Sequence, residues 1–339
     1  MADERIRTRR QFLRDGLTLA SCGVFARRGG GAAGSIVRPT HGTARGRARA
    51  AVDGRVLVIV HLAGGNDGLN TIVPFRRDAY YRSRPHLALA PHGLLRISDE
   101  LGFHPAAVGL KRLFDEGLLA IVQGVGYPNP KRSHLQSMDV WDTALPDSEG
   151  NDGWMERHLG PVRRRRETGG TRQAFVSMPH TAFVQALRNI ERLVAAGSPD
   201  RIYRVSLGGF DTHSAQHDRQ PPLLAQLGEG LTAFVADLNA RGNLERVALM
   251  VFSEFGRTIG ENGSRGTDHG GAAPVFVVGG RVAGGVYGEH PDLDGADGGD
   301  LPYTVDFRRV CAGILTDWLE TDAAGVLGGR FEPLKLLRT

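Results

Sequence analysis

Five short runs of apolar residues recur along the chain, and each ends in a polar loop, most of them rich in glycine. The runs cover residues 56–62, 118–125, 202–207, 247–252 and 274–278. Continuous apolar runs of this length are typical of strands buried on both faces of a parallel sheet. Helical spacing of apolar residues predicts helices at 105–118, 183–196, from Pro221 onward, and 306–319. The pattern predicts an α/β fold with a doubly wound, mostly parallel sheet flanked by helices.

The loop that follows residues 247–252 concentrates charged side chains. It reads SEFGRT at 253–258 and later holds Asp268 and His269. Open α/β sheets bind ligands at the carboxyl ends of their strands. Glu254 offers an anionic oxygen, His269 a neutral nitrogen, and Arg257 a bidentate donor for an anion. The alternative is a surface loop with a Glu–Arg ion pair, because polar loops at strand ends are common.

Two more strand ends carry the same kinds of side chain. Asp67 follows two glycines after the first run, and Asp211 and His213 follow two glycines after the third. Turn chemistry alone is the simpler explanation of Asn, Asp and Gly at 64–70. Convergence of several carboxylates and imidazoles on one edge of a sheet nevertheless predicts a metal or anion site there.

Ser133 stands at the predicted start of a helix, after the run at 118–125. Gln136 lies three residues further on, which predicts a capping box in which Ser133 is simply the N-cap. The same position suits a nucleophile, because a helix N-terminus stabilises anions and would favour an alkoxide. His134 is either a ligand or an interfacial histidine.

The N-terminal stretch is a targeting sequence rather than part of the fold. Residues 8–13, TRRQFL, form a twin-arginine signal, and the apolar segment at 17–26 is far shorter than the ~20 residues needed to span a bilayer. We predict a signal segment at 1–27, a disordered linker at 28–52 and a single α/β domain at 53–339. The twin-arginine translocase would deliver the chain to the periplasm or the extracellular space, with no transmembrane helix after processing. A basic amphipathic helix is the alternative to the export signal. Cys22 lies in a segment that resembles a lipoprotein cleavage box, which would attach the chain to a membrane through a lipid anchor on Cys22.

Charge and cysteine content exclude several classes of protein. Residues 1–50 hold 11 arginines and three acidic residues, and the rest of the chain is slightly acidic, so the net charge of +5 does not indicate nucleic acid binding. Only Cys311 remains once the signal is removed. This excludes an internal disulfide and a cysteine-based zinc site.

Five ordered motifs resemble one known family. They are GGNDGLN at 64–70, RSH at 132–134 with a later Trp141, GFDTH at 209–213 with Gln216, SEFGRT at 253–258, and GTDHG at 266–270. Together they resemble the bacterial domain-of-unknown-function family 1501 over residues 55–337. That family is similar to the alkaline phosphatase and sulfatase superfamily. The resemblance implies an alkaline-phosphatase-like core with a metal site at the strand ends.

The resemblance also implies roles for individual residues. Asp67 matches the first metal-binding aspartate, and Ser133 falls at the nucleophile. Asp211 matches the aspartate of an Asp/His metal motif, with His213 or His217 as its histidine, and His269 resembles the last metal histidine. The chain departs from the superfamily at Ser253-Glu254, where an Asp-His pair is expected, and its segment between 154 and 210 is short.

The function that follows is an exported, metal-dependent hydrolase of phosphate or sulfate esters. Ser133 attacks and Arg257 steadies the oxyanion. One or two divalent metals, from among zinc, manganese, magnesium and calcium, are held by Asp67, Asp211, His213, Glu254 and His269. The alternative is an exported binding or assembly protein that keeps the fold without catalysis. The sequence leaves the ester, the oligomeric state and the metal open.

Changing Arg9 and Arg10 to lysine is expected to leave the protein folded in the cytoplasm, because the twin-arginine translocase recognises the arginine pair. Cell fractionation with an antibody against the chain measures this. Arrival of the double variant in the periplasm would show that the export assignment is wrong.

Overall fold

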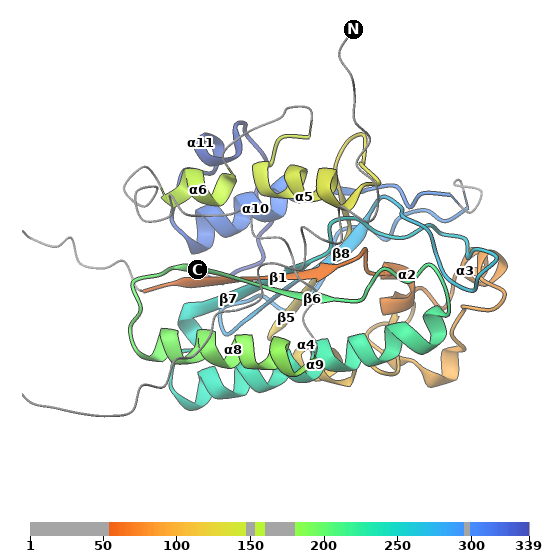
Figure 1. The fold of residues 1–339 in the computed structure, drawn as a ribbon, viewed down its shortest axis with the longest axis horizontal. Helices are drawn as coiled ribbons and strands as arrows, with labels where there is room; N and C mark the ends of the chain where they lie inside the picture. The colour runs from red at the N-terminus through yellow and green to blue at the C-terminus, as the bar shows by residue number, and fades with distance from the viewer. Residues whose placement is uncertain (1–53, 147–152, 160–179, 295–298, 339) are drawn as a thin grey trace, which may run out of the picture. The chain divides into compact units, whose positions relative to one another are not determined.

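The structure, a computed structural model, describes residues 54–146, 153–159, 180–294 and 299–338. The predicted signal segment and linker, with Cys22, lie outside these residues. Within the described chain a central sheet has seven strands in the order β10-β5-β8-β7-β1-β6, with β9 also paired to β5 (Figure 1). The strands are β1 (Val56–Ala63), β5 (Leu119–Gly126), β6 (Ile202–Gly208), β7 (Val247–Phe252), β8 (Ala273–Gly279), β9 (Gly285–Tyr287) and β10 (Val305–Asp306).

Most pairs of strands in this sheet are parallel. β1 pairs in parallel with β6 on one side and β7 on the other. β8 runs antiparallel between β7 and β5, because residues 253–272 turn the chain back beside β7. The predicted doubly wound, mostly parallel sheet is confirmed. The carboxyl ends of β1, β5, β6 and β7 and the start of β8 therefore share one edge.

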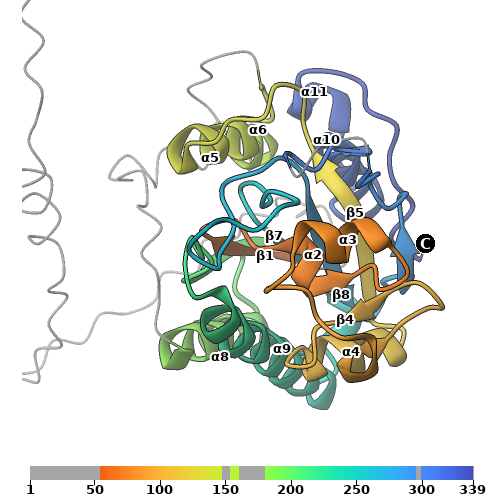
Figure 2. The ribbon, with the colours of Figure 1, turned by 90° about the vertical axis from the view of Figure 1, so that its right-hand side faces the viewer.

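Alternate residues of β1 face opposite layers of helices. Leu57 and Ile59 belong to one apolar cluster, and Val58 and Val60 belong to another, as expected for a strand buried on both faces. Figures 1 and 2 show the two layers on opposite faces of the sheet. The first layer contains α5 (His134–Thr143), α6 (Trp154–Leu159), α10 (Phe307–Gly313), the π-helical turn η3 (Ile314–Trp318) and α11 (Ala323–Leu327). The second contains α4 (Val108–Asp115), α8 (His180–Ala195) and α9 (Gln216–Ala240).

Two predicted helix boundaries are wrong for local reasons. The helix predicted from Pro221 begins at Gln216, because the Gln216 amide is held by Thr212 and Asp67 and fixes the chain there. Of the residues predicted to form a helix at 105–118, only those of α4, Val108–Asp115, are helical in the structure. A separate turn precedes it, in which His104 Nδ1 accepts a hydrogen bond from the Ala106 N–H at 2.9 Å.

A smaller unit that was not predicted lies beside the carboxyl edge of the sheet. A three-stranded sheet in the order β2-β4-β3 packs with two short helices over a third apolar cluster that includes Phe75 and Ile259. The elements of this unit are α2 (Gly68–Thr71), β2 (Ile72–Val73), α3 (Asp78–Ser83), the 3-10 turn η1 (Pro91–Gly93), β3 (Leu95–Arg96) and β4 (Gly102–Phe103). Outside it, the 3-10 turn η2 (Leu244–Arg246) precedes β7. Across the described residues, no helix combines the length and the apolar character that crossing a membrane requires.

His104 should make stability depend on pH. Burial, with the charge of His217, lowers the pKa of His104 to about 4. The unfolded chain takes up this proton near the ordinary pKa of about 6.5, so the stability is complete above that pH and is lost as pH falls toward 4. We expect the loss to reach roughly 3 kcal/mol, at about 1.36 kcal/mol per unit of pKa.

Denaturant unfolding of the wild type and of His104→Asn between pH 7 and pH 4 measures this contribution. Asparagine keeps an acceptor for the Ala106 N–H but does not titrate. Its unfolding free energy should therefore fall less steeply with pH. Equal slopes for the two proteins would contradict the assignment.

Candidate metal centre

Four side chains meet at the carboxyl edge of the sheet, and we call them the histidine–aspartate cluster: His134, Asp211, His213 and His269. Asp211 and His213 follow β6, His134 opens α5, and His269 lies in the loop between β7 and β8. Asp211 Oδ1, His213 Nε2 and His269 Nε2 lie 3.0, 3.0 and 3.1 Å from one another. His134 Nε2 lies 3.8 Å from Asp211 Oδ2. The structure thus brings together three of the five predicted ligands, Asp211, His213 and His269, and adds His134.

Each histidine of the cluster is fixed through Nδ1 by an oxygen that can only accept a hydrogen bond. The partners are Glu254 Oε1 at 2.7 Å for His134, Asp268 Oδ1 at 2.9 Å for His213, and the Arg132 carbonyl oxygen at 2.8 Å for His269. Because these oxygens have no proton to give, we assign the ring proton of all three histidines to Nδ1. The Nε2 lone pairs of the neutral rings then face into the cluster, as they do in histidines that bind metals.

These residues fit a divalent metal ion. Two atoms about 2.1 Å from an ion and at right angles to each other lie about 3.0 Å apart, which is close to the observed spacing of Asp211, His213 and His269. His134, Asp211 and His269 form a wider group, whose ligand atoms lie within 4.8 Å of one another. The cluster also favours positive charge, since the hydrogen bond to Glu254 raises the pKa of His134 against the effect of burial. Imidazole nitrogens together with a carboxylate oxygen suit zinc and related ions.

Arg257 holds the loops of the cluster together. Its buried guanidinium donates to Asp211 Oδ1 at 2.6 Å, to the Gly65 and Thr267 carbonyls at 2.7 Å each, to the Phe210 carbonyl at 3.0 Å, and to the Gly64 carbonyl. Burial raises the pKa of Asp211, but the hydrogen bond and the charge of Arg257, together with the neighbouring histidines, outweigh this effect and leave the pKa below its ordinary value. The predicted role in steadying an oxyanion does not agree with this geometry, because the guanidinium is already engaged. Arg257 is a positioning residue for Asp211.

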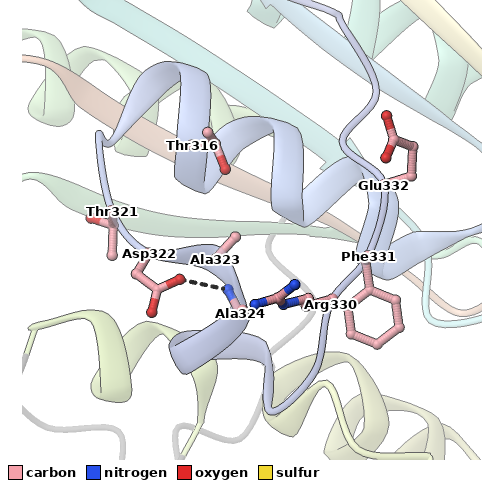
Figure 3. Close-up of a pocket in the computed structure, with 8 residues that line it drawn as sticks. All are labelled: Thr316, Thr321, Asp322, Ala323, Ala324, Arg330, Phe331 and Glu332. Carbon is pink, nitrogen blue, oxygen red and sulfur yellow. Dashed lines mark hydrogen bonds between the residues drawn. The ribbon is translucent and has the colours of Figure 1, made fainter.

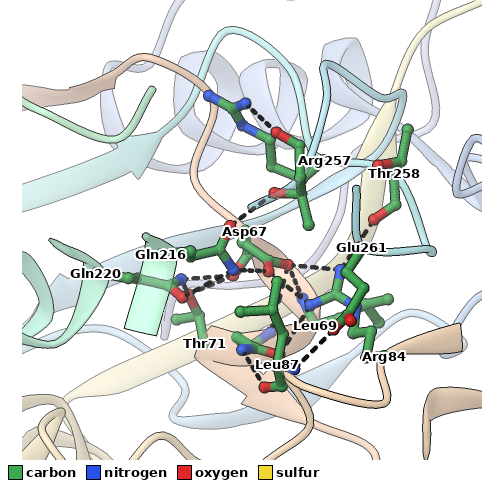
Figure 4. A network of polar contacts seen from close by, with 12 residues as sticks. Asp67, Leu69, Thr71, Arg84, Leu87, Gln216, Gln220, Arg257, Thr258 and Glu261 are labelled. Carbon is green, nitrogen blue, oxygen red and sulfur yellow. Dashed lines mark hydrogen bonds and ion pairs between the residues drawn. The ribbon is translucent and has the colours of Figure 1, made fainter. Parts of the chain in front are cut away.

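Asp67, a predicted metal ligand, has a different function in the structure. Its carboxylate caps α2 by accepting from the Leu69 and Asn70 N–H groups, and Arg84 binds both oxygens at 2.6 and 3.1 Å (Figure 4). Gln216 donates a further bond to Oδ2. With five hydrogen bonds on two buried oxygens, Asp67 has no lone pair left for the cluster.

Arg84 uses all of its N–H groups in this network. Besides Asp67, it donates to Asn70 Oδ1 and to the carbonyl oxygens of Thr258 and Ile259. The side chain is completely buried. The ion pair therefore ties α2 to the start of the loop that leads to His269.

Glu254, the other predicted ligand outside the cluster, lies directly behind His134. Oε1 accepts from His134 Nδ1 and from the Gly64 N–H at 2.8 Å, while Oε2 accepts from His61 Nε2 at 2.8 Å and contacts the Ser253 hydroxyl at 3.3 Å. Burial raises the pKa of Glu254, but the hydrogen bonds from His134 and His61 have the larger effect and bring the pKa well below its ordinary value. Glu254 is thus an ionised support for a histidine rather than a member of the cluster.

Gly64 allows the loops after β1 and β6 to touch. Its φ of +122° is unfavourable for other residues, and a Cβ atom there would lie 2.2 Å from the Asp211 backbone nitrogen. Gly64 therefore serves the placement of Asp211, whereas a Cβ atom on Gly65 would meet the Phe255 ring. The sequence showed the glycines but not which loop they approach.

Ser133 is the N-cap residue of α5, as predicted, but it forms no capping box. Its side chain makes no capping hydrogen bond and is exposed. It directly precedes His134, whose ring belongs to the cluster. His217, the alternative to His213, bonds the His86 carbonyl at 2.7 Å and lies outside the cluster. The RSH motif was the only sequence signal for His134, and it did not separate a ligand from an interfacial histidine.

A pocket of about 500 Å³ lies elsewhere, between η3, the start of α11 and residues 330–332 (Figure 3). The Arg55 side chain, just before β1, bonds the carbonyls of Asp317 and Trp318 in η3. This places the end of η3 at the amino end of β1, away from the histidine–aspartate cluster. Asp322, which lines the pocket, caps α11 through the Ala324 and Gly325 N–H groups.

Comparison with known proteins supports the resemblance seen in the motifs. Residues 162–306 match the model of the family described as "Protein of unknown function (DUF1501)". The predicted resemblance to this family is confirmed. No curated protein matches the chain.

Several solved structures are similar to this chain at low sequence identity. The C-terminal periplasmic domain of EcEptC from Escherichia coli is 9% identical, with a TM-score of 0.41 over 84% of this chain and 88% of that one. A protein in the alkaline phosphatase superfamily from Vibrio parahaemolyticus is 11% identical, with a TM-score of 0.37 over 70% and 64%. The PsFucS1 sulfatase from Pseudoalteromonas sp. is 11% identical, with a TM-score of 0.37 over 70% and 65%. This chain spans slightly less than two thirds of the last two.

Arg257→Lys should destabilise the protein by about 2–4 kcal/mol, because lysine cannot serve all the buried oxygens that Arg257 now bonds. Denaturant unfolding measures the change. Arg112→Lys is the control, since Arg112 is 66% exposed and forms an ion pair with Glu116, four residues away on the surface of α4. The control should change stability by less than about 0.5 kcal/mol. Equal stability of both variants would contradict the positioning role.

Proposed function

We propose that the protein is a hydrolase of phosphate or sulfate esters that depends on one divalent metal ion. The observation that supports this is the convergence of three Nε2 atoms and the Asp211 carboxylate, with every ring fixed at Nδ1 by an acceptor. His134, Asp211, His213 and His269 would hold the ion. When bound, the ion supplies a Lewis acid at the carboxyl edge of the sheet.

Ser133 is the proposed nucleophile. It lies next to a residue of the cluster, at the N-terminus of a ten-residue helix, where the first N–H groups and the helix dipole favour an anionic ester. The Ser133 oxygen attacks the phosphorus or sulfur atom, and the alcohol of the ester departs. Water then cleaves the new ester bond to Ser133 and regenerates the hydroxyl.

Two arguments limit the number of metal ions and their identity. Asp67 and Glu254, which were candidates for a second ion, are engaged by Arg84, His61 and backbone N–H groups, so one ion per chain is proposed. Three imidazole nitrogens favour zinc over manganese, calcium and magnesium, which prefer oxygen ligands. The twin-arginine motif at 8–13 supports action in the periplasm or outside the cell.

A non-catalytic binding protein is the second candidate. The observation in its favour is Arg257, which is buried and already bonds Asp211 and four carbonyl oxygens, so this guanidinium is not available to steady a substrate anion. Such a protein would still bind one ion. The two candidates differ in whether the Ser133 hydroxyl has any chemical effect.

Ser133→Ala is expected to abolish ester turnover while the protein keeps its metal. The measurement uses p-nitrophenyl phosphate and p-nitrophenyl sulfate, with metal content determined by mass spectrometry. Because Ser133 makes no capping bond, the substitution should cost less than about 0.5 kcal/mol of stability. His213→Ala should lose the ion, whereas His217→Ala, the matched histidine outside the cluster, should keep it.

The results separate the candidates. Turnover in the wild type that disappears in Ser133→Ala supports the hydrolase. A wild type that holds one ion but cleaves neither ester, nor any ester of a wider panel, supports the binding protein. Two ions per chain, or an ion retained by His213→Ala, would show that the proposed ligand set is wrong.

A further inference from the structure

Glu254 lies between two histidines from different elements. The residue is buried, and its carboxylate joins His134 Nδ1, from α5, to His61 Nε2, from β1, at 2.7 and 2.8 Å. The Gly64 N–H donates a hydrogen bond of 2.8 Å to Glu254 Oε1, the oxygen that also accepts from His134. Nothing in the proposed function assigns a role to Glu254 or His61. Both are buried, His61 near the carboxyl end of β1 and Glu254 just after β7.

We propose that Glu254 is a positioning residue that makes His134 a metal ligand. The inference rests on the proposed function, since it concerns the same centre. The ionised carboxylate of Glu254 accepts a hydrogen bond from the Nδ1–H group of His134. The Nε2 lone pair of His134 is therefore turned toward Asp211. A carboxylate partner also makes the opposite ring nitrogen a stronger electron donor.

His134 depends on its support more than the other two histidines do. Glu254 is buried with a side chain only 2% exposed, so water cannot take its place. Asp268, behind His213, is 61% exposed and open to replacement by water. The support of His269 is a backbone carbonyl, which no side-chain substitution removes. Within the described part of the chain, the ring contacts that would remain to His134 are with Phe255 and His269, at centroid distances of 4.9 and 4.6 Å.

His61 fixes Glu254 in turn. Its Nε2 faces Glu254 Oε2, which can only accept, so Nε2 carries the proton. The ring stacks on Phe252, the last residue of β7, at 5.2 Å between centroids. A continuous path of hydrogen bonds thus runs from His61 in β1 through Glu254, which follows β7, to His134 in α5, and it sets the orientation of the one histidine that α5 contributes.

Glu254→Gln tests the proposal with little change in shape. The amide oxygen can still accept from the Gly64 N–H and His134, while its NH₂ group faces His61, whose ring can accept by moving its proton to Nδ1. The substitution removes the charge behind His134 and keeps the packing. We expect the affinity for Zn²⁺, measured by competition with a chromophoric chelator, to fall about 10–100-fold.

Two variants serve as comparisons. Glu261→Gln is the matched control, because Glu261 accepts from the His86 ring and from two backbone N–H groups outside the cluster. Its Zn²⁺ affinity should equal that of the wild type. Asp268→Asn should weaken binding less than tenfold, because Asp268 is exposed to water. An affinity of Glu254→Gln equal to that of the control would overturn the proposal.

A second measurement needs neither metal nor a variant. Nitrogen-15 NMR of the metal-free wild type, labelled at histidine, reports which ring nitrogen of His134 carries the proton. A proton on Nδ1 supports the proposal, and a neutral ring with its proton on Nε2 overturns it, even if Glu254→Gln fails to fold. If the wild type binds no Zn²⁺, the proposed function is wrong, and so is the role of His134 as a ligand. If the His134 ring of that protein still carries its proton on Nδ1, Glu254 nevertheless orients the ring.

Discussion

The arrangement of the centre depends on the Arg257 guanidinium more than on any other group. It is buried among the carbonyl oxygens that follow β1 and β6 and the Thr267 carbonyl, and it meets one oxygen of Asp211. Several oxygens this close together repel one another unless a cation lies among them. Arg257 therefore allows three loops to approach closely and directs Asp211 toward His213 and His269.

Arg84 and Arg257 together fix both ends of one loop. Arg84 bonds the carbonyls of Thr258 and Ile259, and Arg257 bonds the carbonyl of Thr267. His269 follows two residues later and is held in turn by the Arg132 carbonyl. Buried guanidinium groups suit this purpose because each offers five donors in a rigid plane. The loop between β7 and β8 is thereby held in place without regular secondary structure over most of its length.

The strands could be predicted from the sequence because burial on both faces requires continuous apolar runs. The meeting of Asp211, His213 and His269 was also predictable, because parallel strands end on a common edge. The roles of Asp67 and Glu254 were not, since a carboxylate is a ligand or a support according to what it faces. Their partners, Arg84 and His61, become neighbours only through folding. His134 was ambiguous for the same reason, because its role depends on Glu254, 120 residues away.

The position of β1 in the sheet also determines when the fold can form. β1 is an interior strand next to the edge strand β6, yet both of its neighbours, β6 and β7, are made much later in the chain, at 202–208 and 247–252. During synthesis the first strand therefore waits with two open edges, and closing such long loops is slow. The sheet can be completed only after most of the chain has left the ribosome. A transport route that carries finished proteins, such as the one expected from the N-terminal arginine pair, suits a chain with this order of strands.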